Sequence, residues 1–216
     1  MPADMAAQTD PLSEHAGFSE MTGALRLLGG AVLRVRPIQP DDVERLRAFH
    51  RRLSTDAIVY RFFRYMPELS EPDAMHFTHL DREDRMALVA TEGEGSEERI
   101  VGVVRYERMT HDTAEVAFVV EDRWQGHGIA TALLHRLARY ARQRGVTRFV
   151  AITMGSNVAM LEVFRHAGYP SSIHFDDAQY SVELDIHASV PFEERSIAPR
   201  EDLGTVRAAE EGVETE

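Results

Sequence analysis

One stretch of the chain, residues 123–131, has the composition of an anion-binding loop: Arg-Trp-Gln-Gly-His-Gly-Ile-Ala-Thr. Apolar and β-branched residues at 115–120 predict a strand before it, and helical periodicity over residues 129–144 predicts a helix after it. The first N–H groups of a helix lack intrahelical acceptors, and the helix dipole places positive charge there. Gly126 and Gly128 carry no Cβ that would keep a phosphate away from those groups. The spacing therefore predicts a phosphate-binding loop.

Two common nucleotide-binding loops do not fit this stretch. A dinucleotide fingerprint needs a third glycine, where this chain has Thr131, and an acidic residue about twenty positions later, which is missing near Arg148. The phosphate loop of nucleotide hydrolases ends in Gly-Lys-Ser/Thr, and this chain has no lysine. For this stretch alone, an ordinary glycine-rich turn remains the simpler alternative.

Other reactive side chains are few. The sequence contains no cysteine, which excludes disulfides, thiolate metal sites and a cysteine nucleophile. His76 and His79 are three residues apart on a predicted helix with Asp73 nearby, which is a spacing seen in metal sites. Because no third strong ligand lies close in sequence, we expect these histidines to have a surface or core role and the protein to hold no metal.

The composition limits the function further. The formal net charge of −12 argues against nucleic-acid binding, which depends on clustered positive charge. No run of about eighteen apolar residues and no secretion signal is present, so we expect a cytoplasmic protein without a membrane partner. All 24 basic residues are arginine, which reflects either a codon bias or an enzyme that modifies lysines and has none of its own.

The hydrophobic pattern predicts one α/β (α+β) domain with a mixed, mostly antiparallel sheet of six to seven strands flanked by helices. We expect a flexible arm at residues 1–30, docked through residues 24–28, a folded domain at residues 31–187 and a disordered acidic tail at residues 188–216. The strands are expected at residues 31–37, 86–90, 100–106, 115–120, 149–153 and 180–186, with one more near Ile173.

Two motifs resemble the GNAT superfamily of N-acetyltransferases. Gln125-x-x-Gly128-x-Ala130 is similar to the family's acyl-CoA pyrophosphate loop, and residues 157–169 resemble its Asn-containing helix followed by Gly-Tyr. Both motifs lie on the elements expected for that fold. The resemblance covers residues 31–187 and implies acetyl-CoA as co-substrate.

A narrower resemblance is to the acetyltransferase domain of bacterial Pat-type protein lysine acetyltransferases, which acetylate acyl-CoA synthetases. Pat-type proteins usually carry a second domain, and the residues before Ala31 are too few for one. We therefore do not expect regulation by a cyclic nucleotide. The residues that carry this resemblance are Ser54, Ala57, Ile58, Val59, Tyr60, Arg61, Phe62, Phe63, Leu69, Ser70, His76, Phe77, Thr78, Ala114, Glu115, Val116, Ala117, Asp122, Arg123, Trp124, Gln125 and Gly126.

The resemblance also implies roles at the site. Glu115 is in the place of the general base, and its apolar neighbours predict partial burial, although pairing with an arginine such as Arg105 is an alternative. Asn157 corresponds to a residue that contacts the pantetheine arm. The family's acid for the leaving thiolate is replaced by Phe164, with Tyr169 as a spare candidate. Backbone groups of Val119 and Val120 would align the pantetheine and thioester, and the pyrophosphate would be held by Gln125, Gly126, His127, Gly128, Ile129, Ala130 and Thr131.

The acceptor is left open by the sequence. Transfer of acetyl to a protein lysine is the first hypothesis, and a small amine such as a polyamine, amino acid or antibiotic is the second. A non-catalytic acyl-CoA-binding regulatory module is the third. We expect the acceptor groove around residues 60–63 and Trp124, where flanking Arg61 and Arg64 would favour a protein. The oligomeric state is not predicted.

Overall fold

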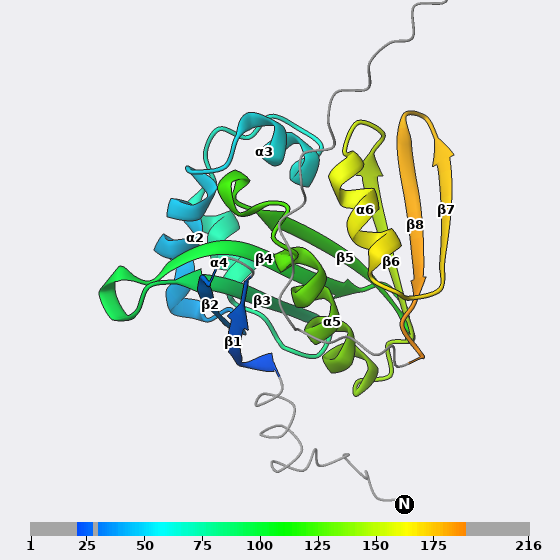
Figure 1. The fold of residues 1–216 in the computed structure, drawn as a ribbon, viewed down its shortest axis with the longest axis horizontal. Helices are drawn as coiled ribbons and strands as arrows, with labels where there is room; N and C mark the ends of the chain where they lie inside the picture. Colours follow the sequence, from blue (N-terminus) through cyan, green and yellow to red (C-terminus); the bar gives the residue numbers. More distant parts are fainter. Residues whose placement is uncertain (1–20, 28–29, 189–216) are drawn as a thin grey trace, which may run out of the picture.

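The computed structural model describes residues 21–27 and 30–188, which form one eight-stranded sheet with helices on both faces (Figure 1). The strand order is β1-β2-β3-β4-β5-β6-β8-β7. The strands are β1 (Gly23–Arg26), β2 (Val32–Pro37), β3 (Arg85–Glu92), β4 (Arg99–Arg108), β5 (Thr113–Val120), β6 (Arg148–Met154), β7 (Ser171–Asp176) and β8 (Gln179–Asp185).

Five α-helices and three short 3-10 turns connect the described strands. Ser54 and Ser70 cap two of the helices by accepting a hydrogen bond from the backbone three residues later, which is the usual role of a serine at this position. The elements are η1 (Pro40–Asp42), α2 (Val43–His50), α3 (Thr55–Phe62), α4 (Glu71–Thr78), η2 (Gly95–Glu97), η3 (Asp122–Trp124), α5 (Ile129–Arg142) and α6 (Val158–His166).

One interruption of the sheet positions the site. Every neighbouring pair of strands is antiparallel except β5 and β6, which run parallel and pair only over residues 113–115 and 148–150. Beyond Glu115 and Val150 the two strands have no pairing with each other. The sheet therefore opens into a wedge between residues 116–120 of β5 and the second half of β6.

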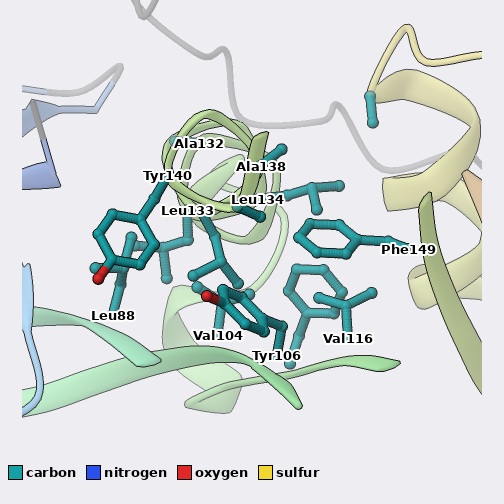
Figure 2. Packing of buried hydrophobic residues seen from close by; sticks show 14 of the residues in the cluster. Leu88, Val104, Tyr106, Val116, Ala132, Leu133, Leu134, Ala138, Tyr140 and Phe149 are labelled. Atoms are coloured by element: carbon teal, nitrogen blue, oxygen red, sulfur yellow. The ribbon is translucent and has the colours of Figure 1, made fainter. Parts of the chain in front are cut away.

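The side chains of the sheet form two cores, because successive residues of a strand point to opposite faces. Helix α5 crosses one face, where Leu133 and Tyr140 pack over Leu88, Val104 and Tyr106 (Figure 2). Burial of a leucine in such a core contributes roughly 1.5–3 kcal/mol. The opposite face carries α2, α3 and α4 over a second core that includes Val89 and Val103.

The mixed, mostly antiparallel sheet is confirmed, but the expected arm is wrong in part. Residues 23–26, assigned to a flexible arm, form β1, which pairs with β2 and brings the sheet to eight strands. Leu25 is fully buried in the α5 core, which explains why this short segment joins the sheet. Residues 1–20, 28–29 and 189–216 lie outside the described residues, and with them most of the arm and nearly all of the acidic tail. No helix in the described chain is long and apolar enough to cross a membrane.

Candidate active site

A cavity of about 710 Å³ occupies the wedge between β5 and β6. Helices α3 and α6 lie at the same end of the sheet, on opposite sides of this opening (Figure 1). The wall comes from α3, β5, the loop before α5, the start of α5, β6 and α6. The cavity thus joins the expected phosphate loop, the expected base and the expected acceptor groove.

The loop at residues 125–128 has the geometry of an anion site. Gly126 and Gly128 have φ of 75° and 73°, the left-handed region that favours glycine. Gly128 is the N-cap of α5, so no side chain covers the first N–H groups of the helix, and its first turn carries no acidic residue. The uncapped N–H groups of the first turn, which begins at Ile129, are therefore available to an anion at the cavity wall.

Neighbouring residues hold this loop in place. The Gln125 side chain donates to the Val120 carbonyl at 3.0 Å, and the His127 ring turns back to the Gln125 carbonyl at 2.9 Å. Asp122 accepts two hydrogen bonds from Ser54, one from its N–H at 3.0 Å and one from its hydroxyl at 2.6 Å. The start of α3 and the phosphate loop are therefore fixed to each other.

Glu115 lies at the point of the wedge and lines the cavity. Its side chain is exposed, so the expectation of partial burial is wrong. The reason is that Glu115 points to the face opposite the α5 core that takes in its apolar neighbours Val116 and Phe118. The alternative of pairing with Arg105 is not found either, since that guanidinium donates to the Phe77 carbonyl at 2.7 Å.

Of the residues predicted to bind the co-substrate, His127 is outside the cavity lining and the others line it. Val119 and Val120 line it on the stretch of β5 that has no β6 partner. Asn157 lines it and caps α6, accepting from the Met160 N–H at 3.2 Å. Phe164 also lines it, buried against the Phe118 ring.

Tyr169 is not a candidate acid. Its hydroxyl lies within 3.1 Å of the His135 ring in a buried contact that belongs to the core, away from the cavity lining. Burial raises the pKa of the Tyr169 phenol, which further weakens its acidity. The tyrosine hydroxyl that does line the cavity belongs to Tyr60, which donates to the Ser156 carbonyl at 3.4 Å and so spans the opening between α3 and α6.

Two polar groups beside the cavity have no partner in the described chain, and only one of them, on Trp124, belongs to a residue expected at the site. The Thr153 hydroxyl and the Trp124 indole N–H are buried, line the cavity and have no hydrogen-bond partner among the described residues. Buried polar groups normally find partners, so both are suited to a ligand in this cavity. The sequence places Thr153 at the end of the strand predicted at residues 149–153, which gives its element without indicating a role.

Comparison with known proteins identifies the chain. The profile of the Acetyltransferase (GNAT) family matches residues 50–169, more than half of its length. The chain belongs to the GNAT acetyltransferase family. The enzyme is therefore an acyl-CoA-dependent N-acetyltransferase that uses acetyl-CoA. Its uncapped helix N-terminus and the orphaned polar groups in its cavity fit that co-substrate.

The GNAT enzyme is similar to Pat-type proteins in both sequence and structure. The crystal structure of the GNAT domain of S. lividans PAT is 40% identical with a TM-score of 0.71, covering 77% of this chain and 98% of that one. Acetyltransferase Pat of Mycolicibacterium smegmatis is 31% identical over 163 residues, covering 74% of this chain but 48% of Pat, so this chain spans about half the length of Pat. Acetyltransferase PA5475 of Pseudomonas aeruginosa is 29% identical over 150 residues, covering 69% of this chain and 81% of that protein.

Proposed function

We propose that the enzyme transfers acetyl from acetyl-CoA to a protein lysine by direct attack in a ternary complex, with Glu115 as the general base. The observation that carries this proposal is the position of Glu115. It is an exposed carboxylate at the point where β5 and β6 part, at one end of the cavity that begins at the phosphate loop. An acceptor amine entering from solvent meets this carboxylate beside the stretch of β5 that has no β6 partner.

The chemistry explains why a base is needed there. A lysine ammonium has a pKa of about 10.4 and cannot attack a carbonyl until it loses a proton. In the proposed step Glu115 takes that proton, the amine nitrogen forms a bond to the thioester carbon, and the carbon–sulfur bond breaks with its electron pair on sulfur. The second proton of the nitrogen passes to solvent, which leaves a neutral amide and the CoA thiolate.

The binding roles follow from the same geometry. The pyrophosphate is assigned to the uncapped start of α5 and to the loop from Gln125 to Thr131. Pantetheine is assigned to the open edge of β5 at Val119 and Val120, where a backbone N–H would also stabilise negative charge on the thioester oxygen. Asn157, on the opposite wall, is assigned a contact with the pantetheine arm.

No side chain is required to protonate the leaving group. Phe164 occupies the position of the family's acid and has no hydroxyl. A thiol of ordinary pKa, about 8.5, leaves readily as a thiolate near neutral pH. Tyr60, the one tyrosine of the described chain that lines the cavity, is assigned to the acceptor groove rather than to acid catalysis.

The similarity to Pat supports a protein acceptor over a small amine. An acyl-CoA synthetase is the first protein to test, because Pat-type enzymes act on that class. The test is a panel assay that follows CoA release with acyl-CoA synthetases, polyamines, amino acids and aminoglycosides as acceptors, and intact mass as a second readout. We expect a mass increase of one acetyl group on a synthetase. Turnover confined to small amines would contradict the protein acceptor, and acyl-CoA binding without turnover on any acceptor would favour the regulatory module.

A further inference from the structure

Two arginines lie beneath the acceptor end of the cavity. Arg61, in the last turn of α3, is half-buried and lines both the large cavity and a small cavity of about 40 Å³ below it. Arg105, on β4, is also half-buried and lines the small cavity. Arg105 lies opposite Ala117 in the β4–β5 register, two residues from Glu115 on the same face of β5. The charges of Arg61 and Glu115 interact, and Arg105 lies beside Ala117 on the same face of the sheet.

Neither arginine forms a salt bridge with a carboxylate of the described chain, although the charge of Glu115 acts on Arg61 and that of Glu107 on Arg105 over a longer distance. Arg105 donates to the Phe77 carbonyl and lies 4.4 Å above the Phe77 ring, and Arg61 lies 5.0 Å from the centre of the Phe62 ring. Among the described residues no carboxylate lies within salt-bridge distance of either guanidinium. Burial, and then the charge of Arg61, lower the pKa of Arg105 to about 9, which is still above neutral pH. Burial also lowers the pKa of Arg61, and the charge of Glu115 opposes this effect.

Arg36 and Arg52, which are also half-buried, are paired with carboxylates. Arg36 contacts Asp42 at 2.6 Å and Glu98 at 3.0 Å, and Arg52 contacts Glu121 at 3.0 Å. Withdrawing a charge from water is costly unless an opposite charge replaces the lost hydration. Arg61 and Arg105 have no carboxylate in direct contact within the described chain, so their donor groups remain available to an anionic group of a ligand.

We propose that Arg61, backed by Arg105, binds a carboxylate of the acceptor that lies close to the amine deprotonated by Glu115. A guanidinium suits this task because its planar donors match the two oxygens of a carboxylate. The inference rests on the proposed function and narrows it to acceptors in which an acidic group accompanies the amine. In a protein that group is an Asp or Glu beside the target lysine, and in a small acceptor it is the carboxylate of a free amino acid.

The first test uses the wild-type enzyme with synthetic peptides. One reference peptide holds a single lysine between glutamines, and four others replace the glutamine at position −2, −1, +1 or +2 with glutamate. We expect at least one glutamate peptide to have a KM about tenfold lower, since a hydrogen bond to a charged group contributes that much affinity. Equal KM values for all five peptides would overturn a flanking acidic residue.

A second arm identifies the source of the carboxylate. Free lysine and lysinamide differ only in the α-carboxylate. A lower KM for free lysine, with no discrimination among the peptides, would assign the subsite to a free amino acid. Equal KM values for free lysine and lysinamide, together with equal KM values for all five peptides, would overturn the proposal as a whole.

The second test assigns the effect to Arg61. In Arg61→Gln the KM difference between the glutamate and reference peptides should disappear. Arg64→Gln is the matched control, because Arg64 is exposed just beyond the same helix and lines neither cavity. This variant should keep the discrimination. If Arg61→Gln keeps the preference for glutamate peptides, or if Arg64→Gln loses it, the assignment of the carboxylate site to Arg61 is overturned.

Binding separates this inference from the proposed chemistry. Peptide affinity is measured by fluorescence anisotropy with CoA present, so the glutamate preference is read without turnover. If Glu115→Gln still turns over while the preference depends on Arg61, the assignment of the base fails and the carboxylate subsite stands. If turnover depends on Glu115 but no preference is found, the subsite fails and the proposed function stands.

Discussion

Glu115 of β5 lies opposite Val150 of β6 at the last position where these two parallel strands pair. The carboxylate therefore marks the point of a wedge whose walls are backbone on one side and α6 on the other. Because the same cavity is lined by this carboxylate and by the uncapped start of α5, it suits a ligand that carries phosphate and a separate reactive group.

Gly126→Ala should weaken acetyl-CoA binding. A left-handed φ costs an L-residue roughly 1–2 kcal/mol, and the added Cβ would also occupy space next to the uncapped N–H groups. We expect the dissociation constant of CoA, measured by calorimetry, to rise about tenfold or more.

Gly145→Ala is the control for this substitution. Gly145 has φ of 79°, close to that of Gly126, and it lies at the far end of α5 outside the cavity lining. The Gly145→Ala variant should lose a similar amount of stability while its affinity for CoA stays unchanged. Equal CoA affinities of the two variants would contradict the phosphate loop.

Thr153→Val should separate stability from binding. The Thr153 side chain is 2% exposed and its hydroxyl has no partner among the described residues, so replacing it with a methyl group removes a buried unsatisfied group. We expect the free energy of unfolding of the ligand-free enzyme to stay constant or rise by about 1 kcal/mol. The dissociation constant of acetyl-CoA should rise about fivefold, the cost of one neutral hydrogen bond.

Thr91→Val is the control, because the same substitution there should change stability and leave acetyl-CoA affinity unchanged. The Thr91 hydroxyl is also buried, but it donates to Glu98 at 3.0 Å and contacts the Arg34 carbonyl at 3.3 Å. This variant should be destabilised and should bind acetyl-CoA normally. Destabilisation of Thr153→Val without a change in CoA affinity would show that its hydroxyl serves the fold and not the ligand.

Asp42 should control stability towards acid. Burial opposes its charge, but hydrogen bonds from Arg36 and from the Gln39 N–H outweigh this effect, so its pKa is lowered in the folded protein. The stabilisation is therefore present above the unfolded pKa of about 3.9 and is lost as the pH falls through the lower folded value. Asp42→Asn should cost about 3 kcal/mol at neutral pH, because it breaks a buried pair.

The difference between Asp42→Asn and wild type should shrink below pH 4 in urea unfolding experiments. The neighbouring Asp41→Asn serves as control, since Asp41 is exposed. It should behave as wild type throughout. A pH-independent difference for Asp42→Asn would mean that packing, and not the ion pair, accounts for its effect.

The sequence predicted those parts of the site that depend on local rules. Gly126 and Gly128 identify the loop because positive φ selects glycine, and the order of strands and helices predicted the sheet. The exposure of Glu115 depends on which face of β5 meets α5, and this is set by distant residues. Unpaired Thr153 and the cation pair of Arg61 and Arg105 likewise depend on non-local contacts, so no local pattern could reveal them.

Strand β1 escaped prediction for a related reason. Its four residues are too few for a periodic signal, and they become a strand because β2 offers a free edge and Leu25 a place in the core. Local propensity carries little information for such a short segment, and tertiary pairing decides its conformation.

The most direct test of the central claim compares Glu115→Gln with Glu107→Gln. Glu107 lies directly opposite Glu115 in the β4–β5 register, so the two variants lose the same charge at almost the same place. General-base catalysis contributes about 10²–10⁴-fold. We predict that kcat/KM for the acceptor falls at least about 100-fold in Glu115→Gln with CoA affinity unchanged, and that it changes by less than about threefold in Glu107→Gln. A similar loss in both variants, or normal turnover in Glu115→Gln, would contradict the account.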